Sequence, residues 1–415
     1  MTKIATRALA TSTIPPSFFI KSLAICLSVL LPTLYGCQPQ STEAPQSEGD
    51  SVITTDPSKE DLMVAKPPKV EAPEVEDTVL RDRIDSVLEF TAQKRHLSLH
   101  EHAAWQILHG VLAFGRDFPL TDANGRKMKA VDHLLAGGQM RGWHMQSGYL
   151  LNSEEAKNGA KKRYGLLASM EGESQAAQGH NDQWLAVLSQ CDLPIDQEIV
   201  VHGETYTIAD WVEQIKKDIP RNVEFSWTLI CLSKYLSSEE SWTDVYGQPW
   251  SLEKIVQKEI EADLHANACG GTHITIGVAM ALERHRERGG KSTGQWARAR
   301  QYLDEQVLAV KRNQNEDGTF STDYFRDKVN SPGLDLHLNA SGHTLEFLAL
   351  HLPKEELEKK WVQKGVHRLC RLFEMTKRYD LECGALYHAA HGLVLYREKV
   401  YGERTYLLEE ANGTQ

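Results

Sequence analysis

The chain has 415 residues, 41% of them hydrophobic, and a formal net charge of −11. It has no long cluster of Lys and Arg, which a nucleic-acid groove needs to neutralise phosphates, so nucleic acid is excluded as a partner. Its seven cysteines form no CxxC pair. An odd number of them remains after the first 37 residues, which predicts buried free thiols.

The first 37 residues predict an export signal. Lys3, Arg7 and Lys21 precede an apolar run at 23–31, and Leu34-Tyr35-Gly36-Cys37 follows it. This order resembles a bacterial lipoprotein signal peptide, whose last cysteine is acylated and becomes the mature N-terminus. An ordinary cleaved signal or a single membrane anchor is the alternative, although the run is shorter than the ~20 residues of a membrane span.

Cys37 is accordingly the predicted lipidation site, and the resemblance implies a lipid-anchored, palmitate-carrying protein of the bacterial cell envelope that faces the periplasm. Gln38 follows this cysteine. Because Gln38 is not the aspartate that retains such proteins in the inner membrane, outer-membrane attachment is favoured. The membrane is therefore an expected partner through this anchor.

Composition divides the rest of the chain into three parts. Residues 38–77 are rich in Ser, Thr, Pro, Glu and Gln, so they cannot bury enough apolar surface to fold and are expected to form a disordered linker. Residues 78–398 contain no Pro- or Ser-rich break and are long enough for one large core. Residues 399–415 form a C-terminal tail.

Helical periodicity dominates residues 78–398 and predicts an all-α domain. One short β-hairpin is expected at 199–206, directly before Thr207, which is predicted to cap a helix, and a long loop is expected at 313–339. The expected helices cover 80–95, 99–114, 127–135, 180–190, 207–217, 222–236, 251–264, 271–286, 295–311, 342–352, 354–377 and 384–397.

Six of the expected helices open alike, with small or polar residues before an apolar run. Recurrence of this kind is typical of stacked helical hairpins, and six hairpins that close on themselves form an (α/α)6 toroid. The openings are His102-Ala103-Ala104-Trp105, Gly179-His180-Asn181-Asp182, Glu224-Phe225-Ser226-Trp227, Gly271-Thr272-His273-Ile274, Gly342-His343-Thr344-Leu345 and Gly384-Ala385-Leu386-Tyr387-His388.

Two motifs resemble those of a known fold. The segment 314–320, Gln-Asn-Glu-Asp-Gly-Thr-Phe, resembles the Q-x-x-D-G-x-W/F turn of squalene-cyclase and prenyltransferase repeats. Tyr387-His388 is similar to the Tyr-His of prenyltransferase β subunits, where the histidine is a zinc ligand. The resemblance implies the toroid fold. The chain lacks the D-x-D-D segment of the cyclases, and Asn267-Ala268-Cys269 stands where prenyltransferases have Asp-x-Cys.

In a toroid the first turns of the inner helices converge on one cavity, so their polar side chains form the candidate site. Helix N-termini favour bound anions there and lower the pKa of histidine, which suits a base or a metal ligand. The alternative is that these histidines only cap helices or make hydrogen bonds inside the barrel. The candidates for the cavity or for catalysis are His102, His180, Asp182, His273, His343 and His388.

The leading expectation is that the protein has no cofactor, and zinc is the alternative for which the sequence offers ligands. Cys269, His273, Cys383 and His388 carry soft or borderline donors at two helix openings, and His391 lies one turn after His388. Since the domain is expected to be exported, a disulfide between Cys269 and Cys383 is the alternative.

The leading functional hypothesis is a binding or scaffold protein of the envelope with a His-lined cavity for a small molecule. The second is an enzyme, a lyase or hydrolase, that acts on a glycan or other envelope substrate through acidic groups and aromatic platforms. Terpenoid cyclase or prenyltransferase-like chemistry is the third. The residues considered for glycan chemistry are Glu171, Glu173, Asp182, Asp317, Glu382, Trp143, Trp184 and Trp227.

Overall fold

The computed structural model describes residues 75–170, 176–219 and 224–407. The expected signal peptide with Cys37 lies outside these residues, as do most of the expected linker and residues 408–415 of the tail. The first helix begins at Val75, inside the segment expected to be a linker. None of the described helices is long and apolar enough to cross a membrane.

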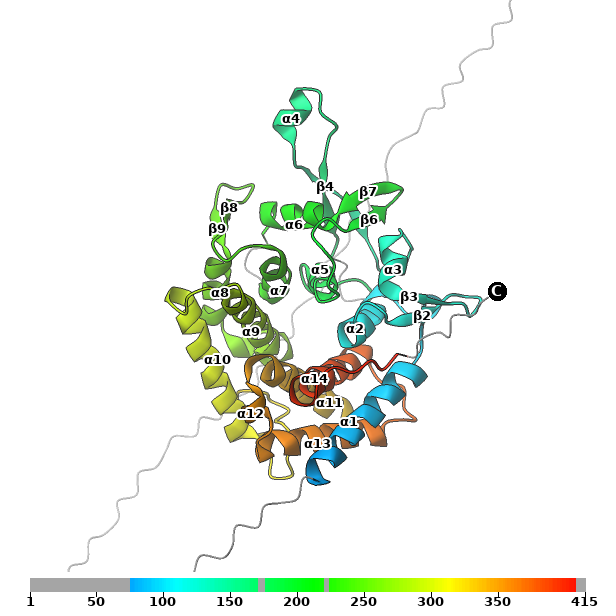
Figure 1. The fold of residues 1–415 in the computed structure, drawn as a ribbon, viewed down its shortest axis with the longest axis vertical. Coiled ribbons are helices and arrows are strands. Elements are labelled where there is room, and N and C mark those ends of the chain that lie inside the picture. Colours follow the sequence, from blue (N-terminus) through cyan, green and yellow to red (C-terminus); the bar gives the residue numbers. More distant parts are fainter. Residues whose placement is uncertain (1–74, 171–175, 220–223, 408–415) are drawn as a thin grey trace, which may run out of the picture. The chain divides into compact units, whose positions relative to one another are not determined.

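The described residues are mostly helical, as the periodicity predicts (Figure 1). Their fourteen α-helices are α1 (Val75–Lys94), α2 (Ala104–Phe114), α3 (Ala130–Leu135), α4 (Ser153–Lys157), α5 (Gln183–Leu188), α6 (Ile208–Lys217), α7 (Ser226–Tyr235), α8 (Leu252–Glu261), α9 (Thr272–Glu287), α10 (Gly294–Asn313), α11 (Leu334–His351), α12 (Lys354–Leu357), α13 (Lys360–Met375) and α14 (Cys383–Tyr401).

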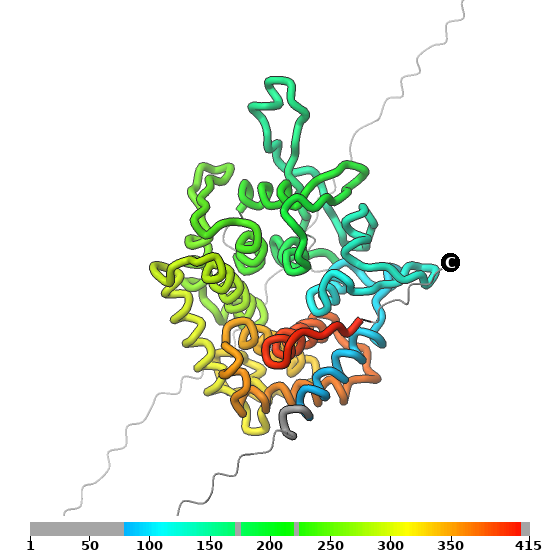
Figure 2. Tube along the Cα trace, in the orientation of Figure 1, coloured from blue at the N-terminus to red at the C-terminus, as the bar shows by residue number. Residues whose placement is uncertain are grey.

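Small strand pairs connect the helices of the first half. β1 (Leu97–Ser98) pairs in parallel with β2 (Pro119–Thr121), and β2 pairs antiparallel with β3 (Lys127–Lys129). Three antiparallel hairpins follow, namely β4 (Met145–Leu150) with β5 (Tyr164–Ala168), β6 (Glu198–Val201) with β7 (Glu204–Thr207), and β8 (Ser241–Thr243) with β9 (Pro249–Ser251). The β4–β5 hairpin, with α4 at its tip, extends away from the helices (Figure 2).

Of these strand pairs, only β6–β7 is expected from the sequence. It leads directly into α6, and the Thr207 hydroxyl accepts a hydrogen bond from the Asp210 N–H at 3.3 Å. The Asp210 carboxylate in turn accepts from the Thr207 N–H at 2.8 Å. This reciprocal capping satisfies two helix N–H groups and is the reason that α6 begins where the sequence predicts.

Six helices contact one another in sequence order. α2 contacts α5, α5 contacts α7, α7 contacts α9, α9 contacts α11, α11 contacts α14, and α14 contacts α2 again. Four more helices pack against this series. α1 contacts α14, α13 contacts α11, α8 contacts α7 and α9, and α10 contacts α9 and α11 (Figure 1). These six helices supply many of the buried side chains of the core.

The backbones of α11 and α14 approach closely at a glycine. A Cβ added to Gly342 would lie 2.6 Å from the N and Cα atoms of Ala389. No side chain larger than hydrogen fits between the two helices at this point. Gly342 thus permits the close packing that brings residues 343–346 of α11 against residues 388–391 of α14.

The start of α11 differs from the expectation. The sequence predicts a helix from residue 342 after a loop at 313–339, whereas α11 already begins at Leu334. Leu338 is fully buried, which extends the apolar face of the helix towards its N-terminus. His343 therefore lies in the middle of α11 and not in its first turn. The other five helices of the series begin close to their expected openings.

Candidate metal centre

A tight turn places Cys269 next to the start of α9. Two short 3-10 segments, Leu264–Ala266 and Ala268–Gly271, precede the helix, and Cys269 and Gly271 both have positive φ, at 49° and 82°. A Cβ on Gly271 would lie 2.3 Å from the Leu264 carbonyl oxygen, so this turn requires glycine there. A cysteine held at positive φ is strained, and such strain is concentrated at functional sites.

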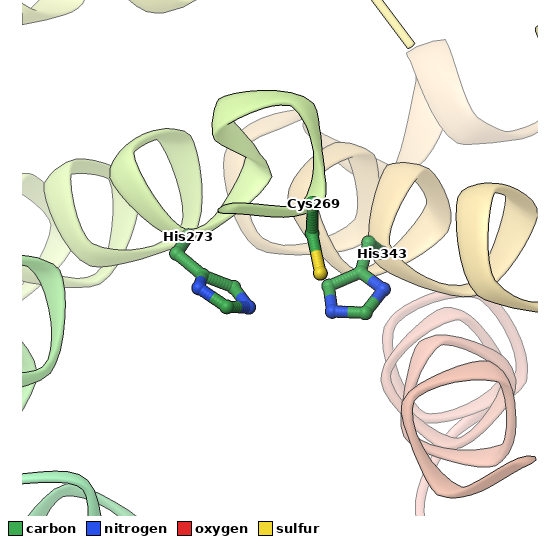
Figure 3. A group of neighbouring side chains, drawn as sticks. All are labelled: Cys269, His273 and His343. Carbon is green, nitrogen blue, oxygen red and sulfur yellow. The ribbon is translucent and has the colours of Figure 1, made fainter. Parts of the chain in front are cut away.

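Cys269, His273 and His343 form a compact group that can hold a metal ion. One ligand atom from each residue lies within 4.8 Å of the other two. Cys269 lies between the two imidazoles, and all three side chains point into the same space (Figure 3). The histidines are 4% and 1% exposed, which excludes most water from their rings.

The outer nitrogen of each imidazole in this group has a fixed partner. His343 Nδ1 lies 2.9 Å from the Asn339 carbonyl oxygen, and His273 Nδ1 lies 3.0 Å from Glu224 Oε1. Because a carbonyl and a carboxylate only accept, each Nδ1 is the donor, and Nε2 is the ring nitrogen left for a metal ion. His343 Nε2 is buried and has no hydrogen-bond partner among the described residues. Metal-ligating histidines are held by the same kind of outer hydrogen bond.

The charges of the group favour a thiolate. Burial alone would raise the pKa of the Cys269 thiol, but the neighbouring His343 and His273 hold that pKa well below its usual value. Burial opposes protonation of His273, yet Glu224 and Cys269 raise its pKa well above the ordinary value. A thiolate beside two imidazoles is the ligand chemistry that zinc prefers.

Glu224 links this group to a third histidine. Its second oxygen lies 3.5 Å from His180 Nδ1, and Glu224, His180 and His273 form another group that can hold a metal. Burial would raise the pKa of Glu224, but His273 and His180 lower it far below the ordinary value. Glu224 is therefore a carboxylate that faces two imidazoles.

Glu346 is a second buried carboxylate that faces two histidines, and it forms a group with His343 and His388. Its oxygens lie 2.9 Å from His388 Nδ1 and 2.7 Å from His391 Nδ1. The His388 ring stacks on the His343 ring with the centroids 3.9 Å apart. Despite burial, the two histidines keep the pKa of Glu346 well below its ordinary value, while burial lowers that of His388. Each of the two buried carboxylates thus has two histidine partners.

The structure brings together four of the six expected cavity residues. Their rings follow one another at centroid distances of 4.8 Å from His180 to His273, 5.3 Å from His273 to His343 and 3.9 Å from His343 to His388. Asp182 accepts a hydrogen bond from the Thr228 hydroxyl at 2.5 Å, and burial raises its pKa to about 6. It belongs to none of the metal-capable groups found among the described residues.

His102 has a different environment. Its Nδ1 accepts a hydrogen bond from the Ser98 N–H at 3.1 Å, as in the alternative that these histidines satisfy backbone groups. It lines a separate pocket together with Cys383.

The expected zinc ligands are only partly brought together. Cys269 and His273 lie in one group, whereas His388 belongs to a neighbouring group with His343 and Glu346. Cys383 belongs to none of the groups in the described ranges. Cys269 and Cys383 are both free thiols, so the alternative of a disulfide between them is not found. His343 takes the place that the sequence analysis gave to Cys383.

Sequence reasoning missed Glu224, Glu346 and His109 as site residues. Glu346 is a carboxylate inside an apolar run, one turn after His343, and that pattern was the available signal. His109 is 4% exposed in α2, its Nδ1 lies 2.6 Å from the Trp105 carbonyl oxygen, and burial lowers its pKa to about 4. Its ring centroid is 5.2 Å from that of His388.

The residues considered for glycan chemistry have structural partners. Asp317 accepts from the Thr319 N–H at 3.0 Å, and Glu382 caps α14 by accepting from the N–H groups of Gly384 and Ala385 at 2.8 and 2.7 Å. Trp184 and Trp227 are buried and offer no open stacking surface, whereas Trp143, 6% exposed, lines a pocket of about 810 Å³. Glu171 and Glu173 lie outside the described residues.

Comparison with protein-family models, with curated proteins and with solved structures found no match for this chain. The site is therefore interpreted from its own geometry. That geometry consists of three overlapping His, Cys and Glu groups, each able to hold a metal ion.

Proposed function

We propose that the chain is an exported, lipid-anchored protein whose domain is an (α/α)6 toroid of the squalene-cyclase and prenyltransferase type. The order of helix contacts supports the toroid, because α2, α5, α7, α9, α11 and α14 each contact the next and α14 contacts α2. The signal-like first 37 residues and Cys37 support the anchor. Both features are consistent with a function in the cell envelope.

Within this domain we infer a zinc centre formed by Cys269, His273 and His343. One observation carries the inference: the buried His343 Nε2 has no partner among the described residues and lies beside the Cys269 thiol. An orphaned buried nitrogen costs free energy, about 1–3 kcal/mol, which a metal ion would remove. The donors are one sulfur and two imidazoles, a set that suits zinc better than magnesium or calcium.

Three protein ligands favour a catalytic centre over a purely structural one. Structural zinc sites have four protein ligands, whereas catalytic sites have three and keep one position for water or substrate. Bound zinc supplies a Lewis acid and an activated water. Around it, Glu224 orients His273 and the Asn339 carbonyl orients His343. We therefore favour an enzyme of the hydrolase or lyase type acting on an envelope substrate over a scaffold protein.

Metal analysis tests this proposal. The purified chain, loaded with zinc and desalted, is expected to retain one equivalent, and Cys269→Ser and His343→Gln are expected to lose it. Cys370→Ser and His285→Gln change a buried cysteine and a buried histidine outside the group, and they should retain the metal. Cobalt substitution should produce a thiolate charge-transfer band that Cys269→Ser abolishes. A wild-type chain that retains no more metal than Cys269→Ser would refute the centre.

A second candidate function is nucleophilic catalysis by Cys269. Cys269 would be the nucleophile, His273 its base, and Glu224 the carboxylate that orients His273. Cys269 also has the strained φ of 49°. Rapid alkylation of Cys269 by iodoacetamide at pH 6, unchanged by chelators and much faster than that of Cys383, would favour this function. Protection of Cys269 by added zinc would favour the metal centre.

A further inference from the structure

A second pocket, of about 330 Å³, is lined by the end of α1, the segment before α2, the segment after α13 and the start of α14. None of the residues in the metal-capable groups lines it. The two expected site residues that do not join those groups, His102 and Cys383, both line it. This pocket is therefore distinct from the candidate metal centre.

The pocket is basic, although the chain as a whole is acidic. Of the described residues that line it, Asp380 has the only carboxylate. The helices α1 and α13 end beside it, and each helix end contributes about half a negative charge. The four Lys and Arg side chains, less Asp380 and the two helix ends, still leave a net positive charge of about 2. The basic lining residues are Lys94, Arg95, His96, His102, Lys377 and Arg378.

Arg95 has an incomplete set of partners. Its two terminal nitrogens donate to the carbonyl oxygens of Tyr379 at 3.0 Å and Thr376 at 2.8 Å, which close the end of α13. Its Nε is buried and has no hydrogen-bond partner among the described residues. Burial lowers the pKa of this guanidinium. An anion in the pocket would compensate the guanidinium charge that burial disfavours.

The rim of the pocket is aromatic. The Tyr379 side chain is 62% exposed, so its ring is open to contact with a ligand. Lys377 Nζ lies 5.1 Å from the centroid of the Phe90 ring, so one wall combines a cation with an aromatic face. A ligand with an anionic end and a planar or apolar end would contact both kinds of surface.

We propose that this pocket binds a phosphate monoester whose phosphate lies among Arg95, Lys377 and Arg378 and whose organic part contacts Tyr379. A dianionic phosphate matches the net positive charge of the lining. The pocket volume of about 330 Å³ is large enough for a small organic phosphate. The binding requires neither the metal centre nor its residues.

Calorimetric titration of the full chain in detergent tests the proposal, with phenyl phosphate and glycerol 3-phosphate as the two probes. The double variant Lys377→Gln/Arg378→Gln should weaken binding at least tenfold. The control Lys311→Gln/Arg312→Gln removes two consecutive, exposed basic residues of α10 that do not line the pocket. It should bind both probes like the wild type. Tyr379→Ala should weaken phenyl phosphate more than glycerol 3-phosphate.

The titration is repeated on Cys269→Ser to separate this pocket from the zinc centre, which can itself attract phosphate. Unchanged affinity in that variant supports the pocket, whether or not the zinc proposal holds. Tighter binding of glycerol 3-phosphate than of phenyl phosphate would contradict the proposed contact between the organic part and Tyr379. Equal affinity of the wild type and Lys377→Gln/Arg378→Gln, or loss of binding in Cys269→Ser, would overturn the proposal.

Discussion

Glu259 of α8 accepts a hydrogen bond from the backbone N–H of Phe225 at 2.8 Å, at the first residue before α7. Its other oxygen accepts from the Ser226 hydroxyl at 2.6 Å. A side chain of α8 thus caps the preceding helix, α7, in the segment that also carries Glu224. Because Glu224 orients His273, the position of α8 is coupled to the candidate metal centre.

This cap makes stability depend on pH. Burial, with the nearby Glu224, raises the pKa of Glu259 from its ordinary 4.5 to about 7. Between these values the folded chain holds a proton that the unfolded chain has released, so stability falls as the pH rises from 4.5 to 7, by about 3 kcal/mol at most. Glu259→Gln should flatten this dependence in urea denaturation. The exposed Glu287→Gln should not change it.

Glu224→Gln is expected to weaken zinc binding about 10- to 100-fold, because His273 loses the charged partner that fixes its ring. Competition with a fluorescent chelator measures this change. Glu239→Gln alters an exposed carboxylate of the same region and serves as the control. Unaltered zinc affinity in Glu224→Gln would argue against His273 as a ligand. The hydrogen bond between His273 Nδ1 and Glu224 would then not affect zinc affinity.

Gly342→Ala is expected to destabilise the fold by about 1–3 kcal/mol, because the added methyl group would lie 2.6 Å from the backbone of Ala389. Chemical denaturation measures the loss. In Gly179→Ala the added Cβ meets its nearest atom at 3.7 Å, so this control should change stability far less. Equal stability of the two variants would show that α11 and α14 separate without cost.

Cys37→Ser is expected to abolish incorporation of labelled palmitate in a bacterial host and to release the chain from the membrane fraction. The thioether-linked lipid can form only on the cysteine that follows the signal. Cys26→Ser keeps the apolar run and changes another cysteine of the signal, so labelling should persist. Membrane attachment of Cys37→Ser would favour the alternative of a single membrane anchor.

The helices could be predicted from the sequence because their signals are local. The cap at Thr207 and the apolar periodicity of α1, α9 and α14 placed these elements within a few residues. Gly342 was misinterpreted as a helix start. A glycine that permits close helix packing has the same local pattern as one that precedes a helix, and only the contact with Ala389 distinguishes the two.

The sequence could predict which residue types form the site, but not which individual residues come together in it. His180, His273, His343 and His388 stood out as polar residues in apolar runs, and the structure brings them together. Cys383 had the same appearance, yet it lies in the basic pocket with His102. Glu224 and Glu346 were missed because a carboxylate shows its role only through its partners.

The sequence by itself determined the helical class, five of the six helix openings and the supply of soft ligands, because periodicity and residue chemistry are properties of short segments. Tertiary structure decided which thiol faces which imidazole. Cys269 and His343 are far apart in the chain, and their distance depends on a turn with three positive φ values and on the packing of α9 against α11. Ligand geometry follows from such packing, which no local pattern encodes.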